Sequence, residues 1–338
     1  MTSQAGRKPP ARRIRGRWLK RGLTLAFFSL VLYLLVSNAK DIAWGDVLES
    51  LHRRPLASLL PAALLAASSF AVYSCYDLLS RRYTGHRLST PQVLSTTFIS
   101  YAFNLNLGSL VGGVGFRHRL YSRLGLGLGE INRIVAFSML TNWIGYVLLA
   151  GLVFLTRPLD IPENWALGSG ALQVAGGILV ALVAAYLLAC AFSRRRTWQM
   201  RGHEIELPGF GMACSQIAIS SLNWLLIASV VHLLLRQEVA YPTVLAVLLI
   251  AAIAGVLTHV PAGLGVLEAV FVTLLSPQVP TRDLLAALLA YRGIYYLAPL
   301  AVAAALYLVL EARFTRRNRG PERSPRDSDS RLQVAPRR

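Results

Sequence analysis

The sequence contains few charged residues. Asp, Glu, Lys and Arg make up only 15% of its 338 residues, whereas a soluble domain has about 25%. Hydrophobic residues make up 54%, and the mean hydropathy is +0.49. Apolar runs near the roughly 20 residues that cross a bilayer recur along the chain. This composition excludes a soluble enzyme and indicates a polytopic membrane protein.

The residues and motifs that many enzymes depend on are scarce. The three cysteines, Cys75, Cys190 and Cys214, lie in or beside apolar segments and form no C-x-x-C pair, so we expect them to be packing residues. The sequence has no H-E-x-x-H, Walker A or G-x-S-x-G motif. No second His or Cys stands at metal-ligand spacing from His259. We therefore expect no metal and no cofactor.

The basic residues are placed as in a membrane protein. The formal net charge of +19 would also suit a nucleic-acid-binding protein, but Lys and Arg flank the apolar segments, where they set topology and attract anionic lipid. We expect membrane lipids and not nucleic acid as partners. The basic clusters are Arg7–Arg21, Arg81–Arg87, Arg117–Arg133, Arg194–Arg201 and Arg313–Arg338.

Two of the apolar segments are interrupted. The segment 92–116 contains Gly112, Gly113 and Gly115, and the segment 244–276 contains Pro261, Gly263 and Gly265. Gly and Pro cost about 1 and 3 kcal/mol in a helix interior, and broken backbone at membrane depth needs protein or a watery cavity around it. We predict backbone breaks at these six residues. The uninterrupted segments, predicted as full spans, are 23–37, 56–79, 133–155, 171–192, 212–235 and 284–311.

Charge counting predicts how the interrupted segments sit. If both are re-entrant, both termini and the connections 80–91, 117–133 and 193–211 face the cytoplasm with 28 of the 35 Lys and Arg. If 92–116 crosses fully, two basic connections move outside. The positive-inside rule favours the re-entrant arrangement.

The re-entrant arrangement implies an inverted repeat. Residues 56–155 and 212–311 then form units of opposite orientation, and GGVGF at 112–116 matches AGLGV at 262–266. Inverted repeats with broken helices are typical of transporters. The predicted fold is all-α, a polytopic helical membrane protein with about six full spans and two oppositely oriented re-entrant helical hairpins.

Three segments complete the predicted organisation. We expect a basic cytoplasmic N-terminus at 1–22, a single transmembrane domain at 23–311 and a basic, disordered cytoplasmic tail at 312–338. A short hairpin is predicted at 197–209, where polar and apolar residues alternate around Arg201-Gly202.

Two ionisable residues are predicted at membrane depth. Glu268 follows the second break, and a carboxylate there must be protonated, paired or facing a wet cavity. Arg292 lies inside the last span beside Tyr291, and its guanidinium binds phosphate or carboxylate in a bidentate manner. Glu268 and Arg292 either pair with each other as a structural element, or Glu268 serves in substrate or proton coupling while Arg292 holds a lipid phosphate or alternates between the two partners.

Further residues are candidates for binding a headgroup. Arg117 and Arg119 follow the first Gly-rich break, where exposed backbone N–H groups suit anions; the alternative is an ordinary basic flank. Asn104 and Asn142 lie in apolar segments, where asparagine often only hydrogen-bonds between helices. With Tyr291, Glu268 and Arg292 they complete the candidate set. Asp77, near a span end, is interpreted as an ordinary interfacial carboxylate.

Several long motifs resemble one family. These are CYDLL (75–79), YAFNLNLGSLVGGVGFRHRLYSRLGL (101–126), TNWIGY (141–146), SSLNW (220–224), HVPAGLGVLEAVF (259–271) and AALLAYRGIYYLAPL (286–300). They are similar to the family built on the transmembrane domain of lysylphosphatidylglycerol synthases, across nearly the whole chain except the tails. The family pattern P-G-G-x-G-x-x-E is present with Ala262 in place of one glycine.

The resemblance implies a function and a location. In the multiple-peptide-resistance members, the domain resembles a flippase that moves aminoacylated phosphatidylglycerol. The synthases also have a soluble aminoacyl-transfer domain, which we do not find here, so we expect no enzyme activity. The resemblance implies a translocase of the bacterial inner membrane for an anionic or aminoacylated phospholipid or a polyprenyl phosphate. The alternatives are an intramembrane headgroup-modifying enzyme and a non-catalytic partner of a phospholipid-synthesis enzyme.

Overall fold

The computed structural model describes residues 44–52, 55–156, 169–193, 197–200, 203–258 and 263–318, with a few isolated positions besides. The segment 1–22, the span expected at 23–37, His259, Pro261 and the tail beyond 318 lie outside this part. The helices are α2 (Trp44–His52), α3 (Leu56–Thr84), α4 (Thr90–Leu107), η1 (Ser109–Gly115), α5 (Phe116–Arg123), α6 (Leu128–Leu155), α7 (Ser169–Phe192), α8 (Phe210–Leu234), α9 (Tyr241–Thr258), α10 (Val266–Leu275), α11 (Thr281–Tyr291), η3 (Arg292–Leu297) and α12 (Ala298–Asn318).

The described part of the chain is almost entirely helical, as predicted. Its two strands, β1 (Thr197–Met200) and β2 (His203–Glu206), pair antiparallel and confirm the short hairpin predicted at 197–209. The helix α12 continues to Asn318, so the predicted start of disorder at 312 is wrong.

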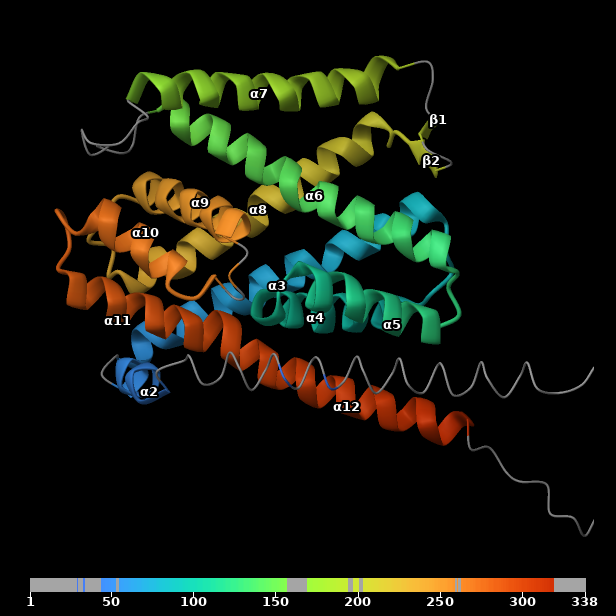
Figure 1. The fold of residues 1–338 in the computed structure, drawn as a ribbon, viewed down its shortest axis with the longest axis horizontal. Coiled ribbons are helices and arrows are strands. Elements are labelled where there is room, and N and C mark those ends of the chain that lie inside the picture. Colours follow the sequence, from blue (N-terminus) through green and yellow to red (C-terminus); the bar gives the residue numbers. More distant parts are fainter. Residues whose placement is uncertain are drawn as a thin grey trace, which may run out of the picture.

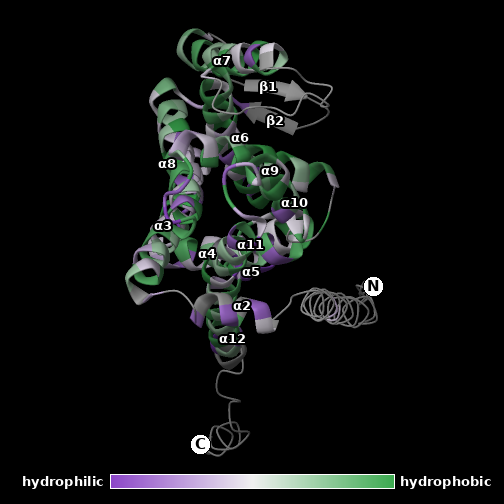
Figure 2. Cartoon of the chain, turned by 90° about the vertical axis from the view of Figure 1, so that its left-hand side faces the viewer, coloured by the Kyte–Doolittle hydropathy of each residue, from purple (hydrophilic) through white to green (hydrophobic). Residues whose placement is uncertain are grey.

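Six helices in the described residues are long and apolar enough to cross a membrane. They are Ala57–Thr84, Leu128–Leu155, Gly170–Phe192, Phe210–Leu234, Tyr241–Thr258 and Thr281–Phe314. Five of them coincide with predicted full spans, and Tyr241–Thr258 belongs to the second interrupted segment. Most of the helical ribbon consists of hydrophobic residues, and hydrophilic residues form short patches, one of them on α2 (Figure 2).

The first interrupted segment folds into a helical hairpin. The side-chain oxygen Oε1 of Gln92 accepts the backbone N–H of Ser89 at 2.9 Å, which caps the start of α4. The helix ends at Gly108, whose φ of 82° lies in the left-handed region that glycine adopts without strain. The chain then reverses, and η1 and α5 pack back against α4.

The predicted breaks in this segment are wrong in position. Gly112, Gly113 and Gly115 lie inside the π-helix η1, and the chain turns at Gly108 instead. Gly112 serves a different purpose, because a Cβ atom there would collide with the backbone of Phe103 in α4. Glycine is needed here for the close approach of the two arms.

The second interrupted segment forms the second hairpin. Its turn contains Gly263 and Gly265, two of the positions at which breaks are predicted, with φ values of 57° and 77°. The returning helix α10 packs against α9. After it, α11, η3 and α12 form one continuous helical segment with Arg292 at the start of its π-helical part.

Each hairpin packs on a helix of the other unit as well as on helices of its own unit. The first helices of the units, α3 and α8, pack against each other; the first hairpin packs on α12 through α4, and the second packs on α6 through α9. The first hairpin opens toward the end of the molecule that holds β1 and β2, and the second opens toward the opposite end (Figure 1). Re-entrant placement of both hairpins in a bilayer stays a prediction.

Ion pairs and hydrogen bonds gather the basic connections at one end. Glu206 accepts the hydroxyl of Tyr83 through its backbone carbonyl at 2.5 Å and pairs with Arg133 through its carboxylate at 3.3 Å. Arg123 pairs with Glu311 at 2.7 Å. The end of α3, the start of α6 and the strand β2 are therefore linked to one another, and the end of α5 is linked to α12.

The close approach at Gly112 predicts a position-specific cost. Gly112→Ala inserts a methyl group against the backbone of α4, and overpacking of this kind costs about 1–3 kcal/mol. We expect a clearly lower thermal unfolding temperature in detergent. The matched control is Gly129→Ala, because a Cβ atom at Gly129 has no atom within 4 Å. Equal melting of the two variants would contradict the tight hairpin.

The hairpin arrangement also predicts which loops share a side. In a variant with its three cysteines replaced by serine, single cysteines at Ser89 and Ser122 should react with an impermeant thiol reagent from the same side of the membrane. A cysteine at Ser276, between α10 and α11, should react from the other side. All three positions are exposed. Labelling of positions 89 and 122 from opposite sides would show that the first hairpin crosses the membrane.

Candidate functional site

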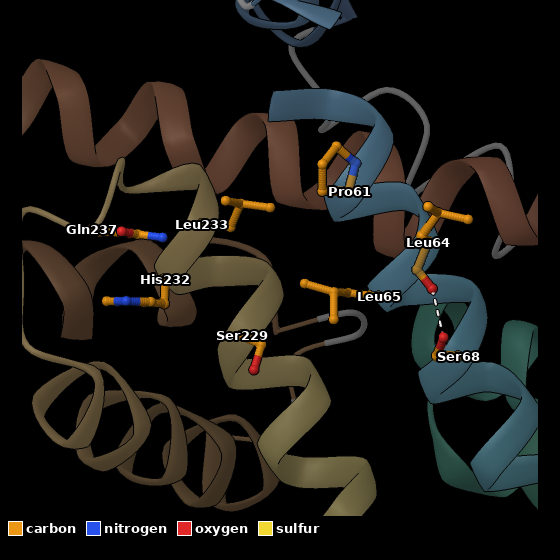
Figure 3. A pocket seen from close by; sticks show the side chains of 8 residues that line it. All are labelled: Pro61, Leu64, Leu65, Ser68, Ser229, His232, Leu233 and Gln237. Carbon is orange, nitrogen blue, oxygen red and sulfur yellow. Dashed lines mark hydrogen bonds between the residues drawn. The ribbon is translucent and has the colours of Figure 1, made fainter. Parts of the chain in front are cut away.

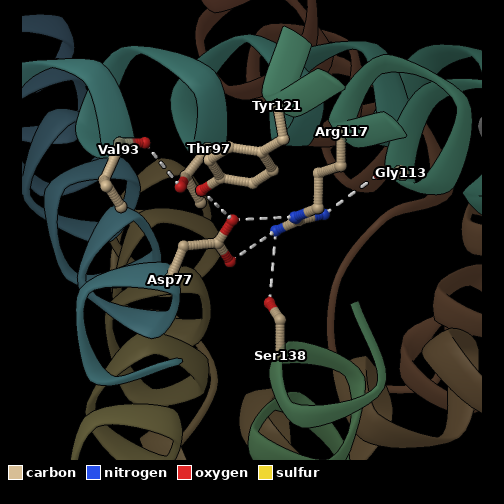
Figure 4. A network of polar contacts seen from close by, with 7 residues as sticks. All are labelled: Asp77, Val93, Thr97, Gly113, Arg117, Tyr121 and Ser138. Carbon is tan, nitrogen blue, oxygen red and sulfur yellow. Dashed lines mark hydrogen bonds and ion pairs between the residues drawn. The ribbon is translucent and has the colours of Figure 1, made fainter. Parts of the chain in front are cut away.

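A buried ion pair fastens the first hairpin to α3 (Figure 4). Arg117 donates from Nε to Asp77 Oδ2 at 3.0 Å and from Nη2 to Asp77 Oδ1 at 3.2 Å. The same guanidinium donates to the carbonyl of Gly113 and to the hydroxyl of Ser138, both at 3.2 Å, and Tyr121 donates to Asp77 at 2.8 Å. Asp77 is 0% exposed and Arg117 only 4%, so this pair is sequestered from bulk water.

The position of this pair corrects two interpretations. Asp77 is not an ordinary interfacial carboxylate, because it is fully buried and accepts three hydrogen bonds. Arg117 is not part of an exposed basic flank, because its side chain points inward to Asp77. The residues before it are helical, so the expected loop of free N–H groups is wrong as well. Headgroup binding by Arg117 stays a prediction.

A second ion pair fastens the second hairpin to the last span. Arg292 donates from Nε to Glu268 Oε1 at 2.5 Å and from Nη2 to Glu268 Oε2 at 2.9 Å. It also donates to the carbonyl of Gly263 in the hairpin turn at 3.0 Å. The side chains are 6% and 17% exposed for Arg292 and Glu268. Glu268 and Arg292 therefore pair, and their pair is more open than that of Asp77 and Arg117.

The two pairs are built differently. In the first unit the hairpin carries the arginine, and the first helix, α3, carries the acid. In the second unit the hairpin carries the acid, and the segment formed by α11, η3 and α12 carries the arginine. Each pair therefore holds its hairpin to a different kind of neighbour.

Arg119 lies nearer the surface than Arg117. It donates to the hydroxyl of Tyr307 at 2.6 Å and to Glu311 at 3.4 Å, both on α12. Its side chain is 11% exposed. Arg119 thus links the first hairpin to the second unit, and headgroup binding by it stays a prediction.

The other predicted site residues have structural neighbours. The side chain of Asn104 lies against Gly113 of the returning arm. The backbone carbonyl of Asn142 accepts hydrogen bonds from Ser220 and Trp224. Tyr291 is buried and stacks on Tyr295, with ring centroids 5.3 Å apart. Their contact with a headgroup is not tested by these packing relations.

A hydrogen-bonded cluster at the contact of the two units escaped the sequence analysis. Ser69 of α3 donates to Asn223 of α8 at 2.7 Å and lies 2.7 Å from the hydroxyl of Tyr295. That hydroxyl is 3.0 Å from the hydroxyl of Tyr101 in α4. The sequence signal is a polar stripe within α3, with Ser69, Tyr73, Tyr76 and Ser80 at helical spacing.

His86 lies beside the first pair, in the connection between α3 and α4. Its ring centroid is 6.2 Å from that of Tyr121. Burial lowers the pKa of the His86 imidazole, while the charge of Glu130 acts in the opposite direction. A lowered pKa favours the neutral imidazole, so burial acts against a positive charge on His86. Stability linked to this ring falls as the pH drops below the ordinary histidine range, since the unfolded chain binds the proton more readily.

An open groove of about 460 Å³ lies between α3 and α8, near the start of α3 and the end of α8 (Figure 3). Its walls include Pro61, Leu65 and Leu233. The hydroxyls of Ser68 and Ser229 in its lining bond to carbonyls of their own helices. The groove is therefore mostly apolar, although His232 and Gln237 also line it.

The fold and the two pairs together define a class. The chain is a polytopic α-helical membrane protein whose helical hairpins are fastened by buried guanidinium–carboxylate pairs. Residues 22–303 match the model of the family described as the lysylphosphatidylglycerol synthase TM region, and the chain belongs to this family. The resemblance noted in the sequence is confirmed.

Its relatives include proteins of similar and of greater length. The inner membrane protein YbhN of Escherichia coli is 45% identical over 300 residues, which cover 88% of this chain and 94% of YbhN. A Synechocystis protein named slr0712 is 28% identical over 302 residues, with 87% and 94% coverage. The phosphatidylglycerol lysyltransferase of Staphylococcus haemolyticus is 26% identical over 298 residues, which cover 84% of this chain but 33% of the lysyltransferase. This chain thus corresponds to about a third of that enzyme.

The buried pair of the first unit predicts a pattern of stability. Asp77→Asn and Arg117→Gln each leave one buried charge without its partner, which typically costs about 3–5 kcal/mol. The double variant should melt at a higher temperature than either single variant. Arg282→Gln, at an exposed arginine, is the control and should change little. Additive losses in the double variant, measured by thermal unfolding in detergent, would contradict the pairing.

Proposed function

We propose that the protein is a lipid translocase of the bacterial inner membrane. Its cargo is a lipid with an anionic or aminoacylated headgroup, either a phospholipid or a polyprenyl phosphate, which it moves between leaflets. Both termini face the cytoplasm in this proposal, and the two hairpins are re-entrant. The observation that carries the proposal is the pair of buried guanidinium–carboxylate contacts, one on each hairpin.

The chemistry of the pairs supports a headgroup path. A buried charge in a membrane protein is costly, and such charges typically mark substrate or ion pathways. A guanidinium bound to a carboxylate in a bidentate manner can exchange it for a phosphate of similar geometry. Arg292 is the first choice for this exchange, because Glu268 is the more exposed acid.

The arrangement of the hairpins supports access from both leaflets. Hairpins that open toward opposite ends divide the membrane thickness into two shorter barriers, as in transporters with inverted repeats. The groove of α3 and α8 gives the acyl chain an apolar surface while the headgroup passes through the protein. The lysyltransferase relative is named for action on phosphatidylglycerol, which favours an anionic phospholipid or its aminoacylated product as the first cargo to test.

The transport prediction concerns the second pair. In proteoliposomes, the wild type should accelerate the movement of fluorescent phosphatidylglycerol between leaflets, measured by dithionite quenching of the outer leaflet. The double variant Glu268→Gln with Arg292→Gln should fold, because neither charge is left unpaired. Its rate should fall roughly tenfold or more, since charge-assisted hydrogen bonds of about 1.5–3 kcal/mol are lost.

Controls separate the alternatives. Arg282→Gln should transport at the wild-type rate, because Arg282 is exposed and belongs to neither buried ion pair. Wild-type transport by the double variant would show that the pair is only structural. Chemically altered lipids found by mass spectrometry, without movement between leaflets, would favour a headgroup-modifying enzyme. Activity only after addition of a phospholipid-synthesis enzyme would favour a partner of that enzyme.

A further inference from the structure

The contact between α3 and α8 is polar in the half that is nearer to the end of α3 and the start of α8. Ser69, Tyr73, Tyr76 and Ser80 form one buried stripe of α3, and Ser220 and Asn223 of α8 are also buried. We call these six residues the polar seam. Membrane helices usually contact each other through small or apolar residues with isolated polar bonds, so a continuous polar stripe between two spans requires an explanation.

Several polar atoms of the seam have no hydrogen-bond partner among the described residues. They are the hydroxyls of Tyr76 and Ser80 and the amide nitrogen of Asn223. The Tyr76 hydroxyl faces Ser220 and Asn223 without reaching hydrogen-bond geometry with either. Tyr76 and Ser80 are 0% exposed and Asn223 is 1% exposed. An unsatisfied buried polar group costs about 1–3 kcal/mol, and native structures rarely leave such groups together.

The seam connects to both ion pairs. At one end, Asp77 follows Tyr76 in the chain, and the guanidinium of Arg117 lies 5.9 Å from the ring centroid of Tyr73. At the other end, Ser69 contacts Tyr295, which lies in η3 three positions after Arg292. The hydroxyl of Tyr101 extends this end. The seam thus approaches both pairs through the ring of Tyr73 and the contact of Ser69 with Tyr295, and water would have to bridge the remaining distance.

We propose that the polar seam binds a file of water molecules and conducts protons between the two ion pairs. Buried waters typically make about three hydrogen bonds to polar groups that lack other partners, and the seam offers donors and acceptors of this kind. Each hydroxyl or water accepts one proton and donates another. Asp77 first takes up a proton at its carboxylate and then passes it to the seam, and the last member of the file gives a proton to the Glu268 carboxylate, so Asp77 returns to its ionised form and no charge remains on the seam.

Proton passage would couple to the lipid step through the same carboxylates, and this part rests on the proposed function. Protonated Glu268 no longer holds Arg292 as an ion pair, which leaves the guanidinium to the anionic headgroup. Deprotonation restores the pair and returns the hairpin to its place. The charged and titratable groups that face the route from the packed elements are Tyr73, Tyr76 and Asp77 of α3, Tyr101 of α4, Arg117 and Tyr121 of α5, Glu268 of α10, and Tyr291, Arg292, Tyr295 and Tyr296 of α11 and η3.

The test uses the whole chain in proteoliposomes that enclose a pH-sensitive dye. A pH gradient is imposed, and proton influx is recorded with wild type, Tyr76→Phe and the control Tyr146→Phe. Tyr146 is also buried, but its hydroxyl donates to the carbonyl of Leu249 at 2.8 Å and not to a residue of the seam. A positioned proton-transfer group typically contributes about 10²–10⁴-fold to a rate, so we expect Tyr76→Phe to lower influx tenfold or more and Tyr146→Phe to leave it unchanged.

The same vesicles report lipid movement with and without the gradient. We expect the gradient to accelerate wild-type movement, and Tyr76→Phe to keep only the gradient-free rate. Proton influx with the wild type that equals influx in protein-free vesicles would overturn the proton route. Influx with Tyr76→Phe that equals influx with the wild type would also overturn it. If Tyr76→Phe does not fold, Ser80→Ala takes its place, while the comparison of wild type with protein-free vesicles needs no variant. Lipid movement with no proton influx refutes only the proton route, and seam-dependent influx with no lipid movement refutes only the translocase.

Discussion

The exclusion of water from charged side chains is the constraint on which this structure depends. Asp77 and Arg117 are both almost completely buried, and neither is tolerable there without the other. Their bidentate contact, with Ser138, Tyr121 and Gly113 around it, fixes α5 against α3 and so holds the first hairpin closed. The contact of Glu268 with Arg292 does the same for the second hairpin. Each hairpin is thus held by a guanidinium–carboxylate contact, and in the proposed translocase a lipid phosphate would replace the carboxylate.

Glycines determine where the hairpins turn and how close their arms lie. Gly108, Gly263 and Gly265 adopt positive φ values at the turns, whereas Gly112 allows two helical arms to approach at backbone contact. The two arms then present side chains of the returning segment, Arg117 or Glu268, to their neighbouring helices. The glycine turns therefore position Arg117 and Glu268, and the ion pairs of these two residues in turn hold the hairpins against their neighbouring helices.

Much of this architecture was predictable from the sequence because it depends on composition and charge. Apolar length predicted the spans, and the distribution of Lys and Arg grouped the connections that meet at one end. The role of Asp77 was missed because its partner lies 40 positions away, and only the packing of the hairpin brings them together. The turn at Gly108 was misplaced because a run of glycines does not reveal which one has a positive φ and which one permits close contact.

The account places an exchangeable anion site on Arg292, at the contact of the second hairpin with the last span. A cryo-electron microscopy structure of the protein in nanodiscs of an anionic phospholipid tests this claim most directly. We expect lipid phosphate density within hydrogen-bond distance of the Arg292 guanidinium, with Glu268 displaced and the hairpin turn inside the bilayer. An intact pair with no lipid beside it in every particle class, or a hairpin turn outside the bilayer, would contradict the account.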